Sequence, residues 1–164
     1  MNPPPQAQAG PVSVLRDVPA SEADIPSDAR LREFARLALE GAAGELNLRI
    51  VSAVESQRLN SQFRGKAKPT NVLSFPAELP EDFPVAILGD LALCAAVIRR
   101  EAAEQGKSPE AHWAHMIIHG CLHLRGYDHQ DDDEAERMEA RETALLATLG
   151  FADPYLFTEE STDS

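Results

Sequence analysis

The sequence predicts a single α+β domain, in which a small mixed β-sheet of about four strands packs against about five helices. Its 164 residues suit one domain better than two. Short apolar runs typical of strands alternate with segments of helical periodicity, and the last three predicted elements are all helices. This order is typical of a layered fold in which helices cover a mixed sheet.

Four segments have the composition of strands. Residues 48–54 alternate as LRIVSAV, and residues 86–94 are apolar with an interruption at Gly89 and Asp90. Pro76 is expected to end a short strand because proline cannot donate to the sheet. The strands are expected at 12–15, 48–54, 72–75 and 86–94.

Five segments predict helices from their apolar spacing and their capping residues. Ser27 or Asp28 can cap the first helix, and Gly44 is its expected end. Ser108 and Pro109 are a typical start for the fourth, with a capping side chain followed by proline at the first helical position. The helices are expected at about 30–43, 55–62, 95–105, 109–125 and 132–149.

Both chain ends are predicted to lie outside the folded unit. Residues 1–10 are rich in Pro and Gln and predict a disordered tail, residues 11–157 form the single domain, and residues 158–164 form a polar tail. The N-terminal segment lacks the basic and apolar regions of a signal peptide. Without a run of about eighteen apolar residues no membrane span is expected, and a cytoplasmic location follows.

The charge and the cysteines exclude some classes of protein. A net charge of −12 argues against a uniformly basic nucleic-acid binder, although a local basic patch stays possible. Cys94 and Cys121 form no CxxC pair, so both are expected to be buried thiols in a reducing compartment.

The segment HGCLHLRGYDH at residues 119–129 has three histidines at metal-ligand spacing. His119 and His123 are one helical turn apart on one face, and a turn at Gly126 can bring His129 to the same ion. Three neutral imidazoles leave one position for water, as in catalytic zinc sites. We therefore expect one Zn²⁺ ion, with other divalent transition metals possible, on a helix near the C-terminal part of the chain.

The same spacing, H-x-x-x-H-x-x-G-x-x-H, occurs in metzincin peptidases. Those enzymes carry a glutamate directly after the first histidine as general base, and this chain has Gly120 there. A peptidase would therefore need another base. Cys121 lies between the first two histidines but points away on the helix, so it is not expected to be a ligand.

Other polar residues near the motif allow two interpretations each. His115 and, less so, His112 could supply an extra ligand, contact substrate or carry a proton, or they could be ordinary partly buried or surface positions. Asp128 could orient a ligand imidazole or cap the turn. The acidic run 131–134 suits a solvated helix start better than a second metal site. The buried face of that last helix is expected to hold Ala135, Met138, Leu145 and Leu149.

Residues 56–77 carry a net positive charge, opposite in sign to the charge of the whole chain. This segment has no acidic residue, and its four basic residues are Arg58, Arg64, Lys66 and Lys68. Arginine suits bidentate contact with phosphate. On composition alone, phosphate binding and an ordinary solvated loop are both open.

Three segments together resemble a known family. HGCLHLRGYDH at 119–129, LNSQFRGKAKPTNVLSFP at 59–76 and LGDLALC at 88–94 resemble the YbeY family of bacterial endoribonucleases, the ribosomal RNA maturation factors. The likeness runs from about the first helix to Leu149. It implies metal-dependent cleavage of single-stranded RNA, maturation of the 3′ end of 16S rRNA, ribosome quality control, and association with the ribosome or its assembly proteins.

The resemblance assigns metal ligation to His119, His123 and His129, and contact with the phosphate and its developing charge to Arg64. Three alternatives stay open: a zincin-like metallopeptidase, a non-catalytic ribosome-assembly factor with a structural zinc, and a hydrolase of small phosphoesters. Further candidates for contact with the substrate or with the ligands are His115, Asp128, Lys66, Lys68 and Arg58.

Overall fold

The computed structural model describes residues 10–19, 21–42, 44–80, 82, 87–127 and 130–155. Within these ranges it contains the predicted order of elements, a mixed sheet of four strands and five helices, which confirms the predicted fold class. The strands are β1 (Val12–Asp17), β2 (Glu45–Val51), β3 (Val72–Pro76) and β4 (Ile87–Cys94). The helices are α1 (Asp28–Leu39), α2 (Ala53–Arg64), α3 (Ala95–Glu104), α4 (Pro109–Leu124) and α5 (Asp132–Thr148).

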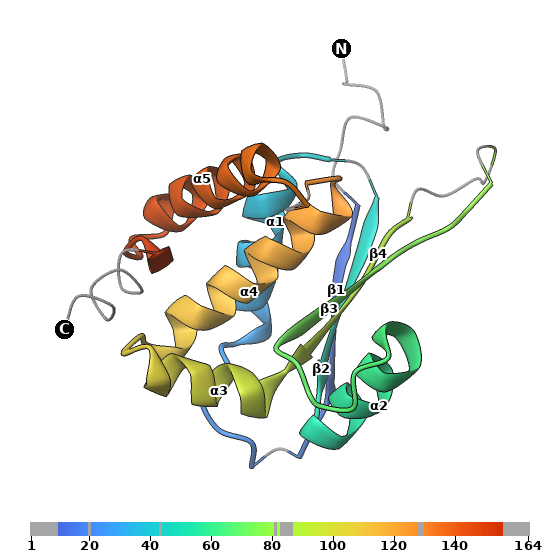
Figure 1. The fold of residues 1–164 in the computed structure, drawn as a ribbon, viewed down its shortest axis with the longest axis vertical. Coiled ribbons are helices and arrows are strands. Elements are labelled where there is room, and N and C mark those ends of the chain that lie inside the picture. Colours follow the sequence, from blue (N-terminus) through green and yellow to red (C-terminus); the bar gives the residue numbers. More distant parts are fainter. Residues whose placement is uncertain are drawn as a thin grey trace.

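The sheet has the strand order β1-β2-β4-β3. The first three strands of this order are parallel, and β3 pairs antiparallel with β4 at one edge. Helices α1, α3 and α4 lie on one face, α5 packs outside α4, and α2 lies on the opposite face (Figure 1). Because β3 is an edge strand, one of its sides keeps backbone groups that the sheet does not use.

Two cores hold the layers together. The larger one lies between the sheet and the helices α1 and α4, and it includes the buried side chains Leu31, Phe34, Ile50, Trp113 and Ile117. A smaller one under α2 contains Val51, Leu59, Leu73, Ala92, Cys94 and Val97. Full burial of each large apolar side chain contributes about 1.5–3 kcal/mol. The end of α2 and the edge strand β3 are therefore held in place by the smaller core.

The first helix ends earlier than predicted. Ser27 caps its N-terminus as expected, with its hydroxyl accepting from the Arg30 N–H at 3.2 Å. The prediction that the helix extends to Gly44 was wrong, because it ends at Leu39 and Glu40 has a left-handed backbone with φ 49°. The Glu40 carboxylate forms ion pairs with Arg125 and Arg141, which lie far along the chain. Helix propensity and capping residues near the helix end carry no information about these remote contacts.

The fourth strand forms as predicted, and the break in its apolar pattern at Gly89 and Asp90 does not end it. β4 runs through both residues, and a register shift against β2 between Glu45 and Leu46 absorbs the irregularity. Gly89 has φ 145°, and a Cβ atom there would lie 2.3 Å from the carbonyl oxygen of Phe75. The glycine thus lets β3 and β4 approach closely.

We expect Gly89→Ala to lower the free energy of unfolding by about 2 kcal/mol, because it adds both backbone strain and a steric clash. Gly41→Ala is the matched control. It has φ 80°, but a Cβ atom there would meet nothing within 4 Å. Urea denaturation of both variants would separate the two effects, and equal losses of stability would contradict a clash at Gly89.

The prediction that the two cysteines are buried is confirmed. Cys94 and Cys121 are buried free thiols. In the described part of the chain no helix is long and apolar enough to cross a membrane.

Candidate active site

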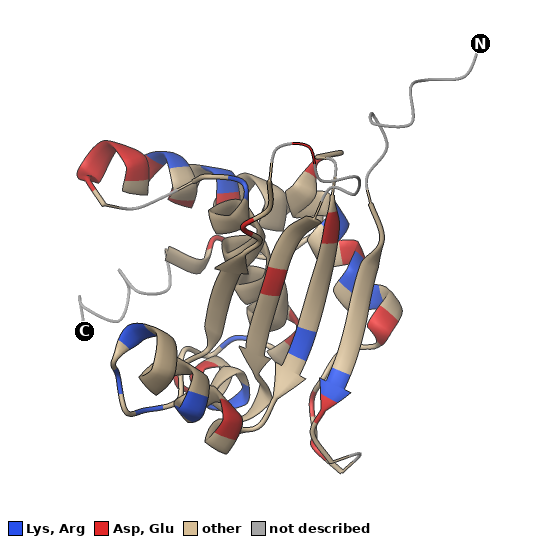
Figure 2. Cartoon of the chain, turned by 90° about the vertical axis from the view of Figure 1, so that its right-hand side faces the viewer, with Lys and Arg blue, Asp and Glu red and all other residues tan. Residues whose placement is uncertain are grey.

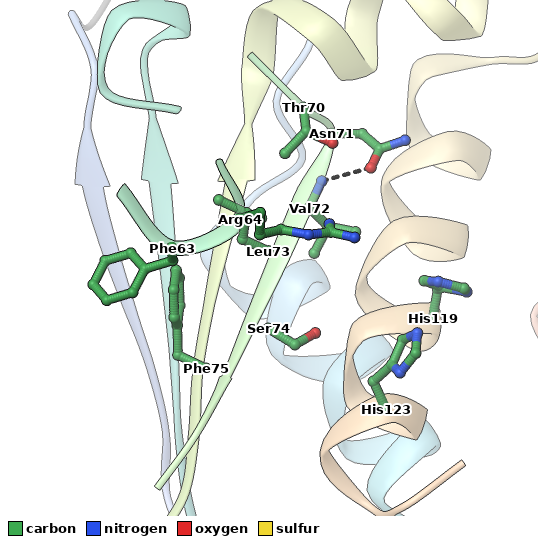
Figure 3. A pocket seen from close by; sticks show the side chains of 10 residues that line it. All are labelled: Phe63, Arg64, Thr70, Asn71, Val72, Leu73, Ser74, Phe75, His119 and His123. Atoms are coloured by element: carbon green, nitrogen blue, oxygen red, sulfur yellow. Dashed lines mark hydrogen bonds between the residues drawn. The ribbon is translucent and has the colours of Figure 1, made fainter. Parts of the chain in front are cut away.

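Helix α4 brings His119 and His123 together. Ser108 caps the helix by accepting the Ala111 N–H at 3.1 Å, and Pro109 begins it, as predicted. The two imidazole centroids are 4.8 Å apart. Both rings are partly exposed, and they point into one cavity (Figure 3).

This cavity, the α4–β3 pocket, has a volume of about 580 Å³. It lies between helix α4 and the edge strand β3, with the end of α2 forming a third side (Figure 3). It is partly open to solvent. Its lining residues are Phe63, Arg64, Thr70, Asn71, Val72, Leu73, Ser74, Phe75, His119 and His123.

Arg64 enters the α4–β3 pocket from α2. It is the last residue of that helix, and Gly65 caps the C-terminus. Figure 3 shows its side chain extending across β3 towards His119 and His123. A guanidinium and two imidazoles from distant segments therefore line one cavity, an arrangement suited to an anionic substrate.

Two polar side chains of α2 fix the loop between Arg64 and β3. The Ser56 hydroxyl donates to the Thr70 carbonyl at 3.0 Å and accepts the Thr70 N–H at 2.9 Å. The buried Asn60 amide donates to the Lys68 carbonyl at 2.8 Å. These bonds bind the loop back onto the helix and so fix the end of α2 against β3.

A buried carboxylate, Glu142 on α5, lies behind the histidines. Its side chain is 1% exposed. It is 2.8 Å from His115 Nε2 and 3.0 Å from His119 Nδ1, and the Tyr155 hydroxyl donates to it at 2.6 Å. Helices α4 and α5 and residue 155 are thus joined by one polar cluster, the Glu142 cluster.

Burial alone would raise the pKa of Glu142, but hydrogen bonds from His115 and His119 bring it to about 2. Burial lowers the pKa of His115 below its usual value, so this imidazole is neutral at pH 7. Lys107 Nζ lies 3.4 Å from His115 Nδ1 and donates to it, which leaves Nε2–H of His115 as the donor to Glu142. Glu142 is therefore an ionised acceptor for its three donors.

This cluster orients His119. Since the ionised carboxylate can only accept, His119 donates through Nδ1. A neutral imidazole with its proton on Nδ1 carries its lone pair on Nε2. The atom that could coordinate a cation is therefore Nε2.

A second polar cluster lies beside the pocket, where Asn71 joins α3 and α4. His112 is 2% exposed, and its Nε2 lies 2.8 Å from a Glu101 oxygen. The Asn71 amide donates to the same carboxylate at 3.1 Å. Burial raises the pKa of Glu101, but the bonds from His112 and Asn71 outweigh it and lower the pKa overall. The interpretation of His112 and His115 as surface or partly buried positions was wrong, because both are buried and hydrogen-bonded.

Two of the predicted site residues, His129 and Asp128, lie outside the described residues. The turn expected to precede them is present, since Gly126 has φ 99° and the Tyr127 N–H returns to the Leu122 carbonyl at 3.0 Å. Among the described residues, no group of three or more His, Cys, Asp or Glu side chains is arranged to hold a metal ion. The three-histidine ligand set stays a prediction.

The basic candidates separate into different places. Arg64 lines the α4–β3 pocket and Arg58 does not. Arg58 is exposed on α2 and pairs with Glu55 at 2.6 Å. It lies six positions before Arg64, which places the two side chains on different faces of the helix. Lys66 and Lys68 are exposed in the following loop and do not line the pocket. Figure 2 shows this basic segment at one end of the sheet.

Glu142 and Tyr155 were not predicted from the sequence as residues of the site. Met138 and Leu145 were expected on the buried face of α5 and are buried, whereas Ala135 and Leu149 are only partly so. Glu142 lies four residues after Met138 and three before Leu145, so helical periodicity alone would have placed a carboxylate on that face. That periodicity was the available signal.

The fold and the pocket define a class of protein: an α+β enzyme whose histidine- and arginine-lined cleft lies beside an edge strand. Comparisons with known proteins identify the family. The family model described as Endoribonuclease YbeY matches residues 22–150. The chain belongs to the YbeY endoribonuclease family.

Relatives and a solved structure agree with this assignment. An Endoribonuclease YbeY from Pseudomonas putida strain KT2440 is 54% identical over 146 residues, which cover 87% of this chain and 93% of the relative. One from Pseudomonas syringae pv. syringae is 54% identical over 147 residues, 88% of either chain. The solution structure of TM1509 from Thermotoga maritima aligns with a TM-score of 0.56 and 27% identity, covering 82% of this chain and 86% of the other.

Proposed function

We propose that this protein is a metal-dependent endoribonuclease that cleaves single-stranded RNA in the α4–β3 pocket. The observation that carries this proposal is the meeting of Arg64 with His119 and His123 in one open cavity. The names of the relatives support the substrate class. The pocket also suits an anionic polymer, because its arginine is followed by Lys66 and Lys68 in a loop free of acidic residues.

The residues that would hold the metal are His119, His123 and His129, and the ion of choice is zinc. The donor chemistry fits, since imidazole is a common zinc ligand and a ligating histidine usually donates its other N–H to a carboxylate. His119 makes such a bond to Glu142. When bound, the ion would supply Lewis acidity to a phosphoryl oxygen or to a water molecule.

The other roles belong to the side chains of the chain itself. Arg64 would hold the phosphate and stabilise the negative charge that grows on its oxygens in the transition state. Glu142 would fix the ring orientation and tautomer of His119 through the Nδ1 bond. His115 and Tyr155 would hold Glu142 in place, since both donate to the same carboxylate oxygen.

The family also supports a finer proposal. We propose that the substrate is the precursor of small-subunit ribosomal RNA, with a role in maturing the 3′ end of 16S rRNA and in ribosome quality control. The partners would then be the ribosome or its assembly proteins, in the cytoplasm. The acidic exterior of the chain, with a net charge of −12, would limit indiscriminate RNA binding.

The direct test measures bound metal and RNA cleavage on the same sample. Wild-type protein, before and after chelation, would be incubated with a labelled single-stranded RNA and with the corresponding duplex. We expect cleavage of the single strand only, loss of cleavage on chelation, and recovery when Zn²⁺ is returned. Binding of metal without cleavage of RNA under any metal condition would reject the nuclease and favour the assembly-factor alternative.

The peptidase alternative loses support at Gly120. A Cβ atom at this position would lie 2.7 Å from Leu91 Cδ2, because the helix packs directly on β4 there. A glutamate at position 120 would therefore meet the core rather than the pocket. The chain has no room for the general base that metzincins carry after the first histidine.

We expect Glu142→Gln to weaken metal binding by about 10–100-fold, the usual effect of removing a carboxylate behind a metal-bound histidine. The glutamine keeps the size of the side chain but removes the charged acceptor. Isothermal titration with Zn²⁺ would measure the affinity, and circular dichroism would verify the fold.

Glu136→Gln is the matched control for this variant, because Glu136 is exposed on the same helix and should leave the zinc affinity unchanged. Equal zinc affinities in wild type and Glu142→Gln would remove the positioning role from Glu142.

A further inference from the structure

The end of the α4–β3 pocket that lies away from the histidines is aromatic. Phe63, in the last turn of α2, and Phe75, on β3, have ring centroids 5.1 Å apart at an interplanar angle of 70°. Both rings line the pocket, and Figure 3 shows them together on the side opposite His119 and His123. Arg64 lies between the two ends.

Phe63 is 58% exposed, whereas Phe34 in the main core is fully buried. Phe75 packs against the small core under α2, but Phe63 is not part of that core. The exposed ring of Phe63 lines the α4–β3 pocket, so part of its surface is available to a ligand there. Its edge contact with Phe75 holds it at the mouth of this pocket.

We propose that Phe63, supported by Phe75, is a stacking platform for one nucleobase of single-stranded RNA. This inference rests on the proposed function and adds the contact with the base. Phe63 and Arg64 are consecutive, so an aromatic ring and a guanidinium are presented side by side at the end of α2. A nucleotide has the matching chemistry, with a flat base and a phosphate a short distance apart.

The platform would also contribute to strand selectivity. A base in a duplex is stacked between its neighbours, so its face is not available to a protein ring. A single strand can turn a base outwards and lay it on an aromatic side chain. Stacking does not distinguish the four bases, because each has a π-face, and the platform would therefore select for unpaired RNA rather than for sequence.

The test is a coupling experiment with abasic oligonucleotides. Wild type and Phe63→Leu would be titrated by fluorescence anisotropy with a labelled 2′-O-methyl strand of about eight nucleotides, whose integrity is verified after each titration. A set of strands with one abasic position each would follow. We expect the intact strand to bind Phe63→Leu about tenfold more weakly than it binds wild type, in line with the loss of one stacked base.

The abasic strands provide the decisive comparison. In wild type, one or two abasic positions should weaken binding about tenfold, and at those positions Phe63→Leu should lose less than twofold. Phe63→Tyr should restore wild-type affinity, since it keeps the ring. Equal abasic losses in wild type and Phe63→Leu, or equal affinity of both for the intact strand, would overturn the proposal.

Val54→Ala is the matched control. Val54 is on the same helix and 81% exposed, but it does not line the pocket, so its removal should not change binding. RNA cleavage by wild type is assayed separately. Cleavage without coupling at Phe63 would reject the platform alone, whereas coupling without cleavage would reject the nuclease and keep a nucleobase site.

Discussion

The His123→Ala variant should lose bound metal and RNA cleavage together while keeping its fold. His123 lies in the last turn of α4, partly exposed, and its ring faces His119 across 4.8 Å between centroids. In the proposed three-imidazole site, removal of this one ligand should lower zinc affinity by at least about 100-fold and reduce cleavage to background. Alanine is a good helix former, so α4 itself should persist.

Elemental analysis of the purified variant would measure bound metal per chain, and thermal unfolding would verify the fold. Removal of the metal should unfold the protein if the zinc is structural, whereas it should only inactivate the protein if the zinc is catalytic. His119 and His123 belong to neither core, so the metal-depleted protein should stay folded and inactive. Full metal occupancy in His123→Ala would refute its assignment as a ligand.

Arg64→Ala should keep a normal metal content but cleave RNA at a strongly reduced rate. The side chain is exposed at the end of α2 and contributes to neither core, so the fold should be unaffected. Loss of one group that stabilises developing charge typically lowers kcat by about 10²–10³-fold. Arg64→Lys should recover only part of this rate, because an ammonium cannot make the bidentate contact of a guanidinium.

Arg58→Ala is the matched control for Arg64. Both are arginines of α2, but Arg58 pairs with Glu55 and lies outside the α4–β3 pocket. Its removal should change the single-turnover rate by less than about twofold, because Arg58 does not line the pocket. Comparable losses of rate in the two variants would mean that the helix supplies general positive charge rather than one positioned group.

Local sequence signals predicted much of the fold. The order of elements was correct, and so were the caps at Ser27 and Ser108, because capping depends on a few adjacent residues. The end of α1 was misplaced because Glu40 is held by Arg125 and Arg141, more than eighty residues away in sequence. Helix propensity carries no information about such partners.

The features of the candidate site also fall into those that local sequence signals predict and those that they do not. The spacing of His119 and His123 is a property of one helix, so their shared face followed from helical periodicity. Arg58 and Arg64 are equivalent in charge and close in sequence, and nothing local says which of them faces β3. The bonds from Ser56 and Asn60 to the following loop decide that orientation.

The sequence by itself therefore determined the fold class, the order of elements, the histidine pair and, through resemblance, the family. The tertiary structure decided which arginine reaches the α4–β3 pocket, that Glu142 lies behind His119, and that Phe63 and Phe75 form one aromatic pair. The physical reason is the range of the interactions. Periodicity and capping act within a few residues, whereas these contacts depend on how helices α2, α4 and α5 pack around the sheet.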